Sequence, residues 1–373
     1  MNRLIERLNY NKDESSKKMV ENIMDQKFLA LASALLHDLG HGPFSHALEG
    51  VTKIKHEVWT REIVKGDTEI NRVLEEHKKG FSNEVAEVIN RTHNNKAVVK
   101  LLSSQLDADR VDWIRDSLMT GAGYGSFDLE WLIHCVRLGE VNGFIEVGLD
   151  LEKGLSIAED FVMARYYMYR NVYFHKTTRC AEMIIDRIFT RVLELKKEGS
   201  SIDLPEELVK VINVKKITQK ELNCFLRLTD YKIWYYIERW SYCDDQILSE
   251  FCKRLLYRDF YKSVKIPEGD LLDLMEKLFE IASKQKVSHK YLFLQDNPKT
   301  SSYKDSYITS KPEEEKEKEK HGEKEASEQI FLFDKKGDAK ELSQESRIIN
   351  TIRNNPISIP LFFVREDLKE SFV

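Results

Sequence analysis

The chain has 373 residues, which is too long for a mini-domain and allows one large domain or two. Apolar residues make up 42 %, enough for a sizeable core, and 58 basic against 63 acidic residues give a net charge of −5. This near balance excludes a strongly basic coat for nucleic acid. Five cysteines without a CxxC pair favour a reducing compartment over a disulfide scaffold or zinc ribbon. We find no long apolar run or signal-peptide core, so we expect no membrane span and a cytoplasmic protein.

Apolar residues at helical spacing predict that most of residues 1–290 is helical. In chain order, the predicted helices are 25–36, 84–89, 98–118, a long region at 157–195, and then 219–228, 230–240, 244–254 and 271–284. We predict a hairpin between 143–149 and 155–157, and short strands at 291–294, 329–333 and 356–364. The tract 311–328 holds five Lys and eight Glu, a net charge of −3, so we expect it to be a solvated insertion.

Four of the ten histidines fall between positions 37 and 56, and His37 is followed directly by Asp38 at the end of an apolar helix. An isolated carboxylate is costly at a buried helix end, so a divalent metal is the simplest partner for this pair. Imidazole and carboxylate together suit Mn, Fe, Zn, Ni or Co. The glycine-containing loop beyond carries His41 and His46, where they could meet a substrate.

One His–Asp pair cannot fill a coordination sphere, so a further ligand should come from a second helix. Asp109, Asp112 and Asp116 share one face of the predicted helix, and Arg110 and Arg115 flank them. Acids for a metal beside arginines for phosphate favour a phosphohydrolase. The alternative, a solvated and salt-bridged helix face, stays open on this pattern alone.

Three strings carry a resemblance to a known family. LLHDLGHGPFSH at 35–46 and SSQLDADRVDWIRDS at 103–117 resemble the HD-domain phosphohydrolases, and more narrowly their deoxynucleoside triphosphate (dNTP) triphosphohydrolase branch. ARYYMYRNVYFHK at 164–176 is similar to a helix that lines the nucleotide pocket in that branch. The resemblance covers most of the chain and implies a mostly α fold. The expected fold comprises an HD-domain helical bundle at 1–195, a helical extension at 196–290 and a smaller α+β C-terminal region at 291–373.

Carried over position by position, the resemblance implies that His37, Asp38 and Asp109 bind the metal. Mg²⁺ would accompany the nucleotide. The remaining site residues fall into two groups. The resemblance implies catalytic roles for His41, His46, His56 and Glu57, and contacts with the dNTP for Arg110, Trp113, Asp116, Arg165, Tyr173 and Lys176.

The family pattern is H…HD…D, and this sequence has no histidine before His37. We expect Met1 to lie just past the position of the first ligand. Three hypotheses follow: the chain is a fragment or has a mis-assigned start, it binds metal poorly, or a substitute ligand such as His93 serves.

The resemblance predicts metal-dependent hydrolysis of dNTPs to deoxynucleoside and triphosphate. By the same resemblance we expect a homo-oligomer, either a dimer or a tetramer, and nucleic acid is not indicated as a partner. Two alternatives remain: an HD phosphohydrolase acting on another nucleotide phosphoester, and a catalytically impaired nucleotide-binding homologue.

Overall fold

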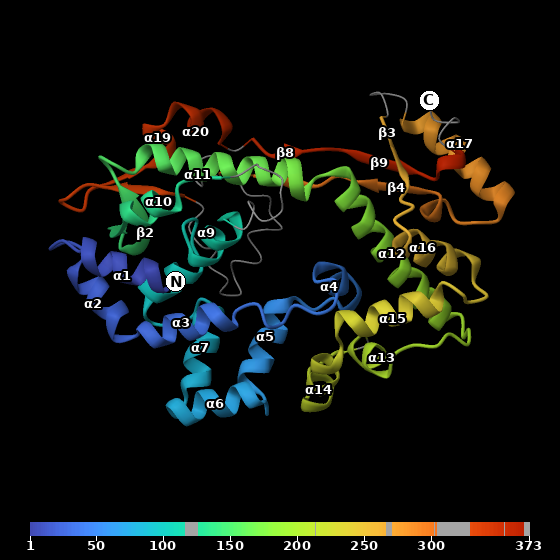
Figure 1. Ribbon diagram of the computed structural model, residues 1–373, viewed down its shortest axis with the longest axis horizontal. Coiled ribbons are helices and arrows are strands. Elements are labelled where there is room, and N and C mark those ends of the chain that lie inside the picture. The colour runs from blue at the N-terminus through green and yellow to red at the C-terminus, as the bar shows by residue number, and fades with distance from the viewer. Residues whose placement is uncertain are drawn as a thin grey trace. The chain divides into compact units, whose positions relative to one another are not determined.

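The computed structural model of the chain describes residues 1–115, 126–212, 214–265, 271–301, 303, 329–353 and 355–368. The fold is mostly α, as predicted, with short strands that include a small C-terminal group (Figure 1). Contacts between residues divide the chain into two compact units. The first comprises 1–40, 60–172 and 300–357, and the second comprises 41–59, 173–299 and 358–373. The three domain ranges 1–195, 196–290 and 291–373 stay a prediction.

The first unit is built on short amphipathic helices. In α1, Leu4, Ile5 and Leu8 are buried at helical spacing, and they join one large apolar cluster with buried residues of the other helices. The helices are α1 (Asn2–Asn11), α2 (Lys17–Asp25), α3 (Lys27–Leu36), α6 (Glu69–His77), α7 (Phe81–Ile89), α8 (Lys96–Leu102), α9 (Ala108–Arg115), α10 (Leu129–Cys135), α11 (Leu155–Met168), α19 (Leu342–Glu345) and α20 (Arg347–Ile352). Helix α5 (His56–Lys65) begins in the second unit and ends in the first.

A four-stranded sheet packs into the same cluster, in the order β1 (Val136–Val141), β2 (Phe144–Asp150), β6 (Phe331–Phe333) and β7 (Ala339–Glu341). Strands β1 and β2 are antiparallel, and β6 pairs with β2 in parallel. The predicted hairpin between 143–149 and 155–157 is wrong. Residues 155–157 open α11, and the turn Asn142–Gly143, with φ of 52° and 80°, joins β1 to β2 instead. Positive φ at both turn residues matches the twist of a two-residue hairpin.

The predicted single helix 98–118 is interrupted. Helix α8 ends at Leu102 and α9 begins at Ala108. Between them, the Asp107 carboxylate accepts hydrogen bonds from the backbone N–H groups of Ser104 (3.1 Å) and Arg110 (2.7 Å). Serine and aspartate compete in this way with helical hydrogen bonds, so the chain turns here. The end of this prediction, together with Asp116, lies outside the described residues.

The predicted helical region 157–195 is helical along most of its length. Helix α11 passes into a π-helical turn, η2 (Tyr169–Tyr173), before α12 (Lys176–Lys197) begins. His175 marks the break. Its backbone is extended, and its ring Nδ1 caps the start of α12 by accepting from the Thr177 N–H. Single π-helical turns within helices frequently occur at functional sites.

The second unit is also helical. Its elements are α4 (His46–Thr52), α12, α13 (Glu206–Ile212), α14 (Gln219–Arg227), α15 (Asp230–Trp240), α16 (Gln246–Leu256), α17 (Leu271–Gln285) and the 3₁₀ turn η3 (His289–Tyr291). Thr218, Thr229 and Asp245 cap α14, α15 and α16 through their side chains, which explains why these helices begin close to their predicted starts.

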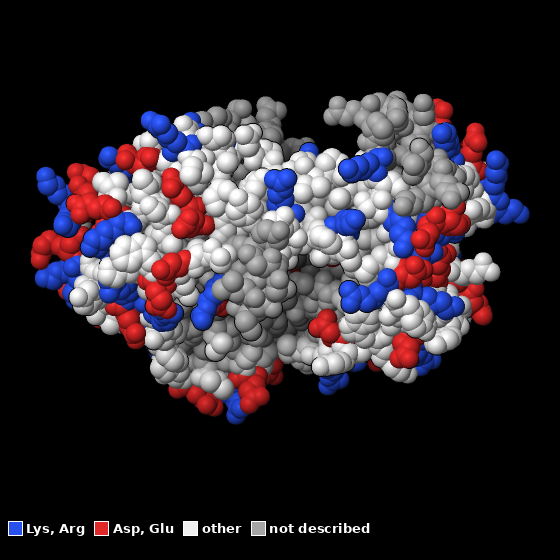
Figure 2. All heavy atoms as spheres, turned by 45° about the horizontal axis from the view of Figure 1, so that its top comes forward, with Lys and Arg blue, Asp and Glu red and all other residues white. Residues whose placement is uncertain are grey.

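A three-stranded antiparallel sheet completes the second unit, in the order β3 (Lys262–Val264), β9 (Leu361–Val364) and β4 (Phe293–Asp296). Two further strands, β5 (Lys299–Thr300) and β8 (Ile357–Ser358), are two residues long. The insertion 311–328 lies outside the described residues. Among the residues that are described, no helix is long and apolar enough to cross a membrane. On the face drawn in Figure 2, basic and acidic side chains are interspersed rather than gathered by sign.

Candidate functional site

Three predicted metal ligands lie together in the first unit. His37 and Asp38 follow the last residue of α3, and Asp109 lies in the first turn of α9. One ligand atom from each of the three lies within 4.8 Å of the other two. The helix end at Leu36 permits this arrangement, because neighbouring residues within a regular helix point about 100° apart.

The imidazole of His37 is oriented by its own helix. Its Nδ1 lies 3.0 Å from the Ala34 carbonyl oxygen, which can only accept, so Nδ1 carries the proton. Its Nε2 is buried and has no hydrogen-bond partner among the described residues. Oxygens of Asp38 and Asp109 lie 3.4 and 3.5 Å from that nitrogen.

The two carboxylates favour a positive charge at the His37 nitrogen that they face. The Asp109 carboxylate raises the pKa of His37 to about 9, with a smaller contribution from Asp38 and against the effect of burial. A divalent ion of the Mn, Fe, Zn, Ni or Co type would satisfy the imidazole nitrogen and both carboxylates at once. The residues present therefore fit a divalent metal, and its identity is left open by a mixed nitrogen and oxygen donor set.

Thr60 ties down the turn that carries His37 and Asp38. Its hydroxyl donates to the His37 carbonyl oxygen at 2.9 Å and accepts from the Gly40 N–H at 2.9 Å. Thr60 is fully buried in α5, so these hydrogen bonds are shielded from water. The sequence carried no signal for this contact, which joins residues about twenty positions apart.

Two predicted phosphate ligands also lie in the first unit. Arg110 is ion-paired with Asp107 at 3.6 Å and donates to the Ser104 carbonyl oxygen. Burial raises the pKa of the Asp107 carboxyl to about 6, although Arg110 opposes this shift. Arg165, from α11, donates to the side-chain oxygen of Gln105 at 2.6 Å. Burial lowers the pKa of Arg165, and the charge of Arg110 adds to that shift.

Trp113 borders the same group of residues. Its indole meets the ring of Tyr169 edge-on, with centroids 6.2 Å apart. The Arg165 guanidinium lies 5.9 Å from the centroid of that tyrosine ring. Tyr169 therefore connects Trp113 to Arg165, which in turn contacts Gln105. Neither Tyr169 nor Gln105 was assigned a role from the sequence.

The second unit contains the predicted catalytic histidines. The rings of His41 and His56 stack with centroids 3.8 Å apart and an interplanar angle of 17°. His56 Nδ1 lies 2.5 Å from an oxygen of Glu49, and Glu57 is 3.7 Å from the same nitrogen. Glu49 was missed in the sequence. The sequence did contain one indication of its position: Glu49 is an acid in the first turn of α4, shortly after the histidine-containing loop.

The loop before α4 is strained. Phe44 and Ser45 have φ of 55° and 50°, in a region that residues with a side chain seldom adopt. Such strain costs about 1–3 kcal/mol per residue and clusters at functional sites. The Ser45 hydroxyl lies 2.8 Å from His41 Nδ1, so this backbone conformation helps to orient a predicted catalytic ring.

Four predicted site residues remain: His46, Tyr173, Lys176 and Asp116. His46 is the first residue of α4, and its side chain is not described. Tyr173 ends the π-helical turn with 38 % of its surface exposed, and Lys176 is the first residue of α12. Asp116 lies outside the described residues. The roles predicted for all of these residues stay predictions.

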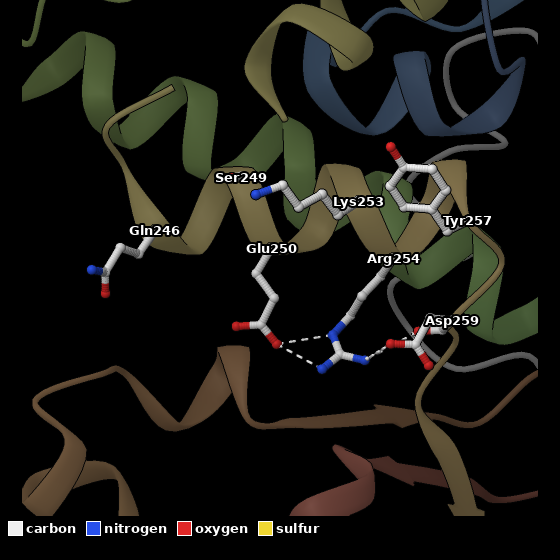
Figure 3. A pocket seen from close by; sticks show the side chains of 7 residues that line it. All are labelled: Gln246, Ser249, Glu250, Lys253, Arg254, Tyr257 and Asp259. Atoms are coloured by element: carbon white, nitrogen blue, oxygen red, sulfur yellow. Dashed lines mark hydrogen bonds and ion pairs between the residues drawn. The ribbon is translucent and has the colours of Figure 1, made fainter. Parts of the chain in front are cut away.

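A surface pocket of about 460 Å³ lies along α16 in the second unit (Figure 3). None of the predicted site residues lines it. Its Arg254 guanidinium is held between the carboxylates of Glu250 and Asp259, with nitrogen–oxygen distances of 2.8 and 3.0 Å. The charges that line the pocket are therefore largely paired with one another.

The chain is similar in sequence to a known protein family and to a curated protein. Residues 14–114 match the family model of the HD domain, and residues 127–211 match that of the HD associated region. The chain is 36 % identical over 348 residues to the uncharacterized protein YwfO of Bacillus subtilis, an alignment that covers 91 % of this chain and 76 % of YwfO.

Two further proteins are more distant. The deoxynucleoside triphosphate triphosphohydrolase SAMHD1 homolog of Dictyostelium discoideum is 26 % identical, over 50 % of this chain and 37 % of that protein. Among solved structures, a phosphohydrolase from Bacteroides thetaiotaomicron superposes with a TM-score of 0.74 at 21 % identity, covering 98 % of this chain and 84 % of the other. At that identity the superposition is evidence for a shared fold.

Proposed function

Because the chain belongs to the HD-domain phosphohydrolase family, we propose that it hydrolyses dNTPs to the deoxynucleoside and inorganic triphosphate. The likeness to the triphosphohydrolase homolog of Dictyostelium discoideum supports this choice within the family. The observation that carries the proposal is local. Helix α9 presents Asp109, which faces His37, next to Arg110, so groups suited to a metal and groups suited to phosphate adjoin in one unit.

The acids and arginines have complementary roles in this proposal. A divalent ion held by His37, Asp38 and Asp109 would supply Lewis acidity toward a phosphate and lower the pKa of a water molecule. Arg110 and Arg165 bind the β- and γ-phosphates, because planar guanidinium groups bind phosphate through paired hydrogen bonds. Mg²⁺ accompanies the triphosphate, since it prefers phosphate and water oxygens.

The reaction needs proton transfer as well. Water attacks the α-phosphorus, the bond from phosphorus to the 5′-oxygen breaks, and that oxygen requires a proton to leave as a hydroxyl group. We assign this transfer to His46, helped by Glu57, and charge stabilisation to His41. Glu49 holds the ring of His56 by accepting its Nδ1–H. A carboxylate in this position fixes the tautomer and the orientation of an imidazole.

Discrimination between deoxyribose and ribose is assigned to the sugar contacts. Tyr173 packs against the deoxyribose and disfavours a 2′-hydroxyl, Asp116 accepts from the 3′-hydroxyl, and Trp113 and Lys176 complete the substrate contacts. The exposed surface of Tyr173, at the end of a π-helical turn, supports a contact with a ligand.

The proposal is tested with the purified full chain. After metal removal by a chelator, Mn²⁺ is restored together with Mg²⁺, and each dNTP and each ribonucleoside triphosphate is supplied in turn. We expect turnover only with metal, and dNTPs favoured by at least about tenfold, since a steric contact with one hydroxyl discriminates by this order. Asp38→Ala and His37→Ala should abolish turnover, and His77→Ala, at an exposed position on α6, should not.

Two results would contradict the proposal. Equal turnover by wild type and Asp38→Ala would exclude the metal site. Preference for a nucleoside monophosphate, a cyclic dinucleotide or a ribonucleotide would exclude the dNTP assignment and leave the family membership intact.

A further inference from the structure

We propose that Gln105 is a positioning residue that orients the Arg165 guanidinium toward phosphate while leaving its positive charge uncompensated. This inference rests on the function proposed above and identifies how that site keeps a cation available for the triphosphate. Gln105 is buried, with 8 % of its surface exposed, and its side-chain oxygen accepts from Arg165 Nη1 at 2.6 Å. The two residues lie 60 positions apart, one in the loop before α9 and the other on α11.

The loop that carries Gln105 is held on both sides. Before it, the Ser104 N–H donates to Asp107, and after it, the buried Leu106 donates its N–H to the Ser104 hydroxyl at 3.3 Å. Arg110 closes the loop from α9 by donating to the Ser104 carbonyl oxygen. These hydrogen bonds fix the backbone of Gln105, so its side chain offers Arg165 an acceptor in a constant place.

Arg165 lacks a carboxylate partner among the residues that the structure describes. Within the described part of the chain it forms no ion pair, and its buried Nε has no hydrogen-bond partner. The carboxylate that acts on it from a distance, Asp107, is already engaged with Arg110 at 3.6 Å. Burial without a counter-ion lowers the pKa of Arg165. Such a cation gains more from an incoming anion than one that is already neutralised.

Other arginines of this chain with restricted exposure show the contrast. Arg191 pairs with Asp245 at 2.7 Å, and Arg179 pairs with Asp296. Arg254 pairs with Glu250, as Figure 3 shows. Hydrogen bonding to Asp245 raises the pKa of Arg191, whereas the pKa of Arg165 is lowered. These arginines contribute structural ion pairs, whereas Arg165 donates to the neutral amide of Gln105 and also interacts with the Tyr169 side chain.

The difference between an amide and a carboxylate decides what Arg165 can bind. Both accept a hydrogen bond and both fix the direction of the guanidinium. A carboxylate also cancels its charge, and a phosphate would then have to compete with it. The amide of Gln105 therefore supplies orientation alone, which suits a site for the phosphates of a nucleoside triphosphate.

The test replaces the amide with a carboxylate of the same shape. Inorganic triphosphate is titrated calorimetrically into the metal-free full chain of the wild type, Gln105→Glu and Gln105→Ala. We expect Gln105→Glu to unfold at no lower temperature than wild type and to bind triphosphate at least about tenfold more weakly, since it forms an internal ion pair in place of the one with phosphate. Gln105→Ala, which keeps the charge and loses the orientation, should bind more weakly than wild type and more tightly than Gln105→Glu.

Turnover provides a second readout. Gln105→Glu should raise KM for dNTP with a much smaller change in kcat, because the lost interaction is made in the ground state and the transition state alike. A purely structural role would leave KM unchanged in a variant that folds normally. Gln246→Glu makes the same charge change at an exposed position on α16 and should leave triphosphate affinity and KM unchanged.

The outcomes separate the two proposals. If wild type binds triphosphate and Gln105→Glu binds it equally well, the role of Gln105 is refuted and the proposed function stands. If wild type itself fails to bind triphosphate, the proposed function fails and the role of Gln105 with it. If Gln105→Glu does not fold, equal affinity of Gln105→Ala and wild type refutes the positioning role.

Discussion

Replacing Thr60 with valine tests whether α5 holds the turn that carries the proposed metal ligands. The Thr60 hydroxyl makes two buried hydrogen bonds of 2.9 Å, one to the His37 carbonyl oxygen and one from the Gly40 N–H. Valine has nearly the same shape as threonine and can make neither bond. Thr60→Val therefore leaves one buried donor and one buried acceptor without a partner, while the packing around them is kept.

The magnitude follows from these two groups. A buried polar group that loses its partner costs about 1–3 kcal/mol, so the loss of two partners should lower the free energy of unfolding by about 2–6 kcal/mol in Thr60→Val. Thr60→Ser is the matched control, because it keeps the hydroxyl and loses one methyl group, at a cost of about 1 kcal/mol. Since the turn also carries His37, Mn²⁺ affinity should fall about tenfold in the valine variant alone, as it does when an outer partner of a metal ligand is removed.

Urea denaturation followed by circular dichroism measures the first quantity, and calorimetric titration of Mn²⁺ measures the second. If Thr60→Val and Thr60→Ser unfold at the same urea concentration and bind Mn²⁺ equally, the turn is not held by this hydroxyl. That result would refute the reasoning, because the two hydrogen bonds would then make no measurable contribution to the free energy of unfolding or to Mn²⁺ affinity.

Three further predictions concern catalysis, packing and helix capping. Glu49→Gln removes the charge that holds His56, so kcat should fall about 10–100-fold without loss of thermal stability, and an unchanged kcat would contradict this role. Gly148→Ala places a methyl group against a backbone carbonyl of β6 and should lower the free energy of unfolding by about 1–3 kcal/mol, whereas Gly50→Ala meets open space and should not. Asp245→Ala loses both the cap of α16 and an ion pair to α12, and should destabilise the fold by more than Asp245→Asn, which keeps the cap. Burial alone would raise the pKa of Asp245, but the ion pair with Arg191 holds that pKa below its usual value. The stability that this ion pair contributes is therefore present above about pH 4 and is lost as the pH falls further. An acid unfolding midpoint shared by wild type and Asp245→Asn would contradict this.

Helices were predictable where the apolar pattern is local. The prediction 230–240 coincides with α15, because Ile233, Ile237 and Trp240 recur at helical spacing and Thr229 caps the start. A periodic pattern of this kind depends on neighbouring residues alone. A prediction made from such a pattern therefore does not require knowledge of contacts with distant parts of the chain.

Strand pairing was harder to predict. The pairing of β2 with β1 had a local signal, the Asn142–Gly143 turn, which the prediction of a hairpin with 155–157 overlooked. The pairing of β2 with β6 joins Leu149 to Leu332 across more than 180 residues and has no local signal. The break after Leu102 depends on the side chain of Asp107, so apolar spacing alone extended one helix through it.

The candidate site also contains residues that the sequence identified and residues that only the folded structure reveals. A short string contains His37 and Asp38, and the family resemblance selects Asp109 from the acids on one face of the predicted helix; the ligand atoms of these three residues do lie together. Thr60 and Gln105 act through hydrogen bonds to residues 23 and 60 positions away. Nothing in their own neighbourhood marks them, because their roles exist only in the folded chain.

The products formed from dGTP test the central claim most directly. Phosphorus NMR of wild type with Mn²⁺, Mg²⁺ and dGTP should show inorganic triphosphate, with deoxyguanosine as the other product, and Asp109→Ala should form neither. Appearance of pyrophosphate with dGMP, of phosphate with dGDP, or of the same products from Asp109→Ala would contradict the account.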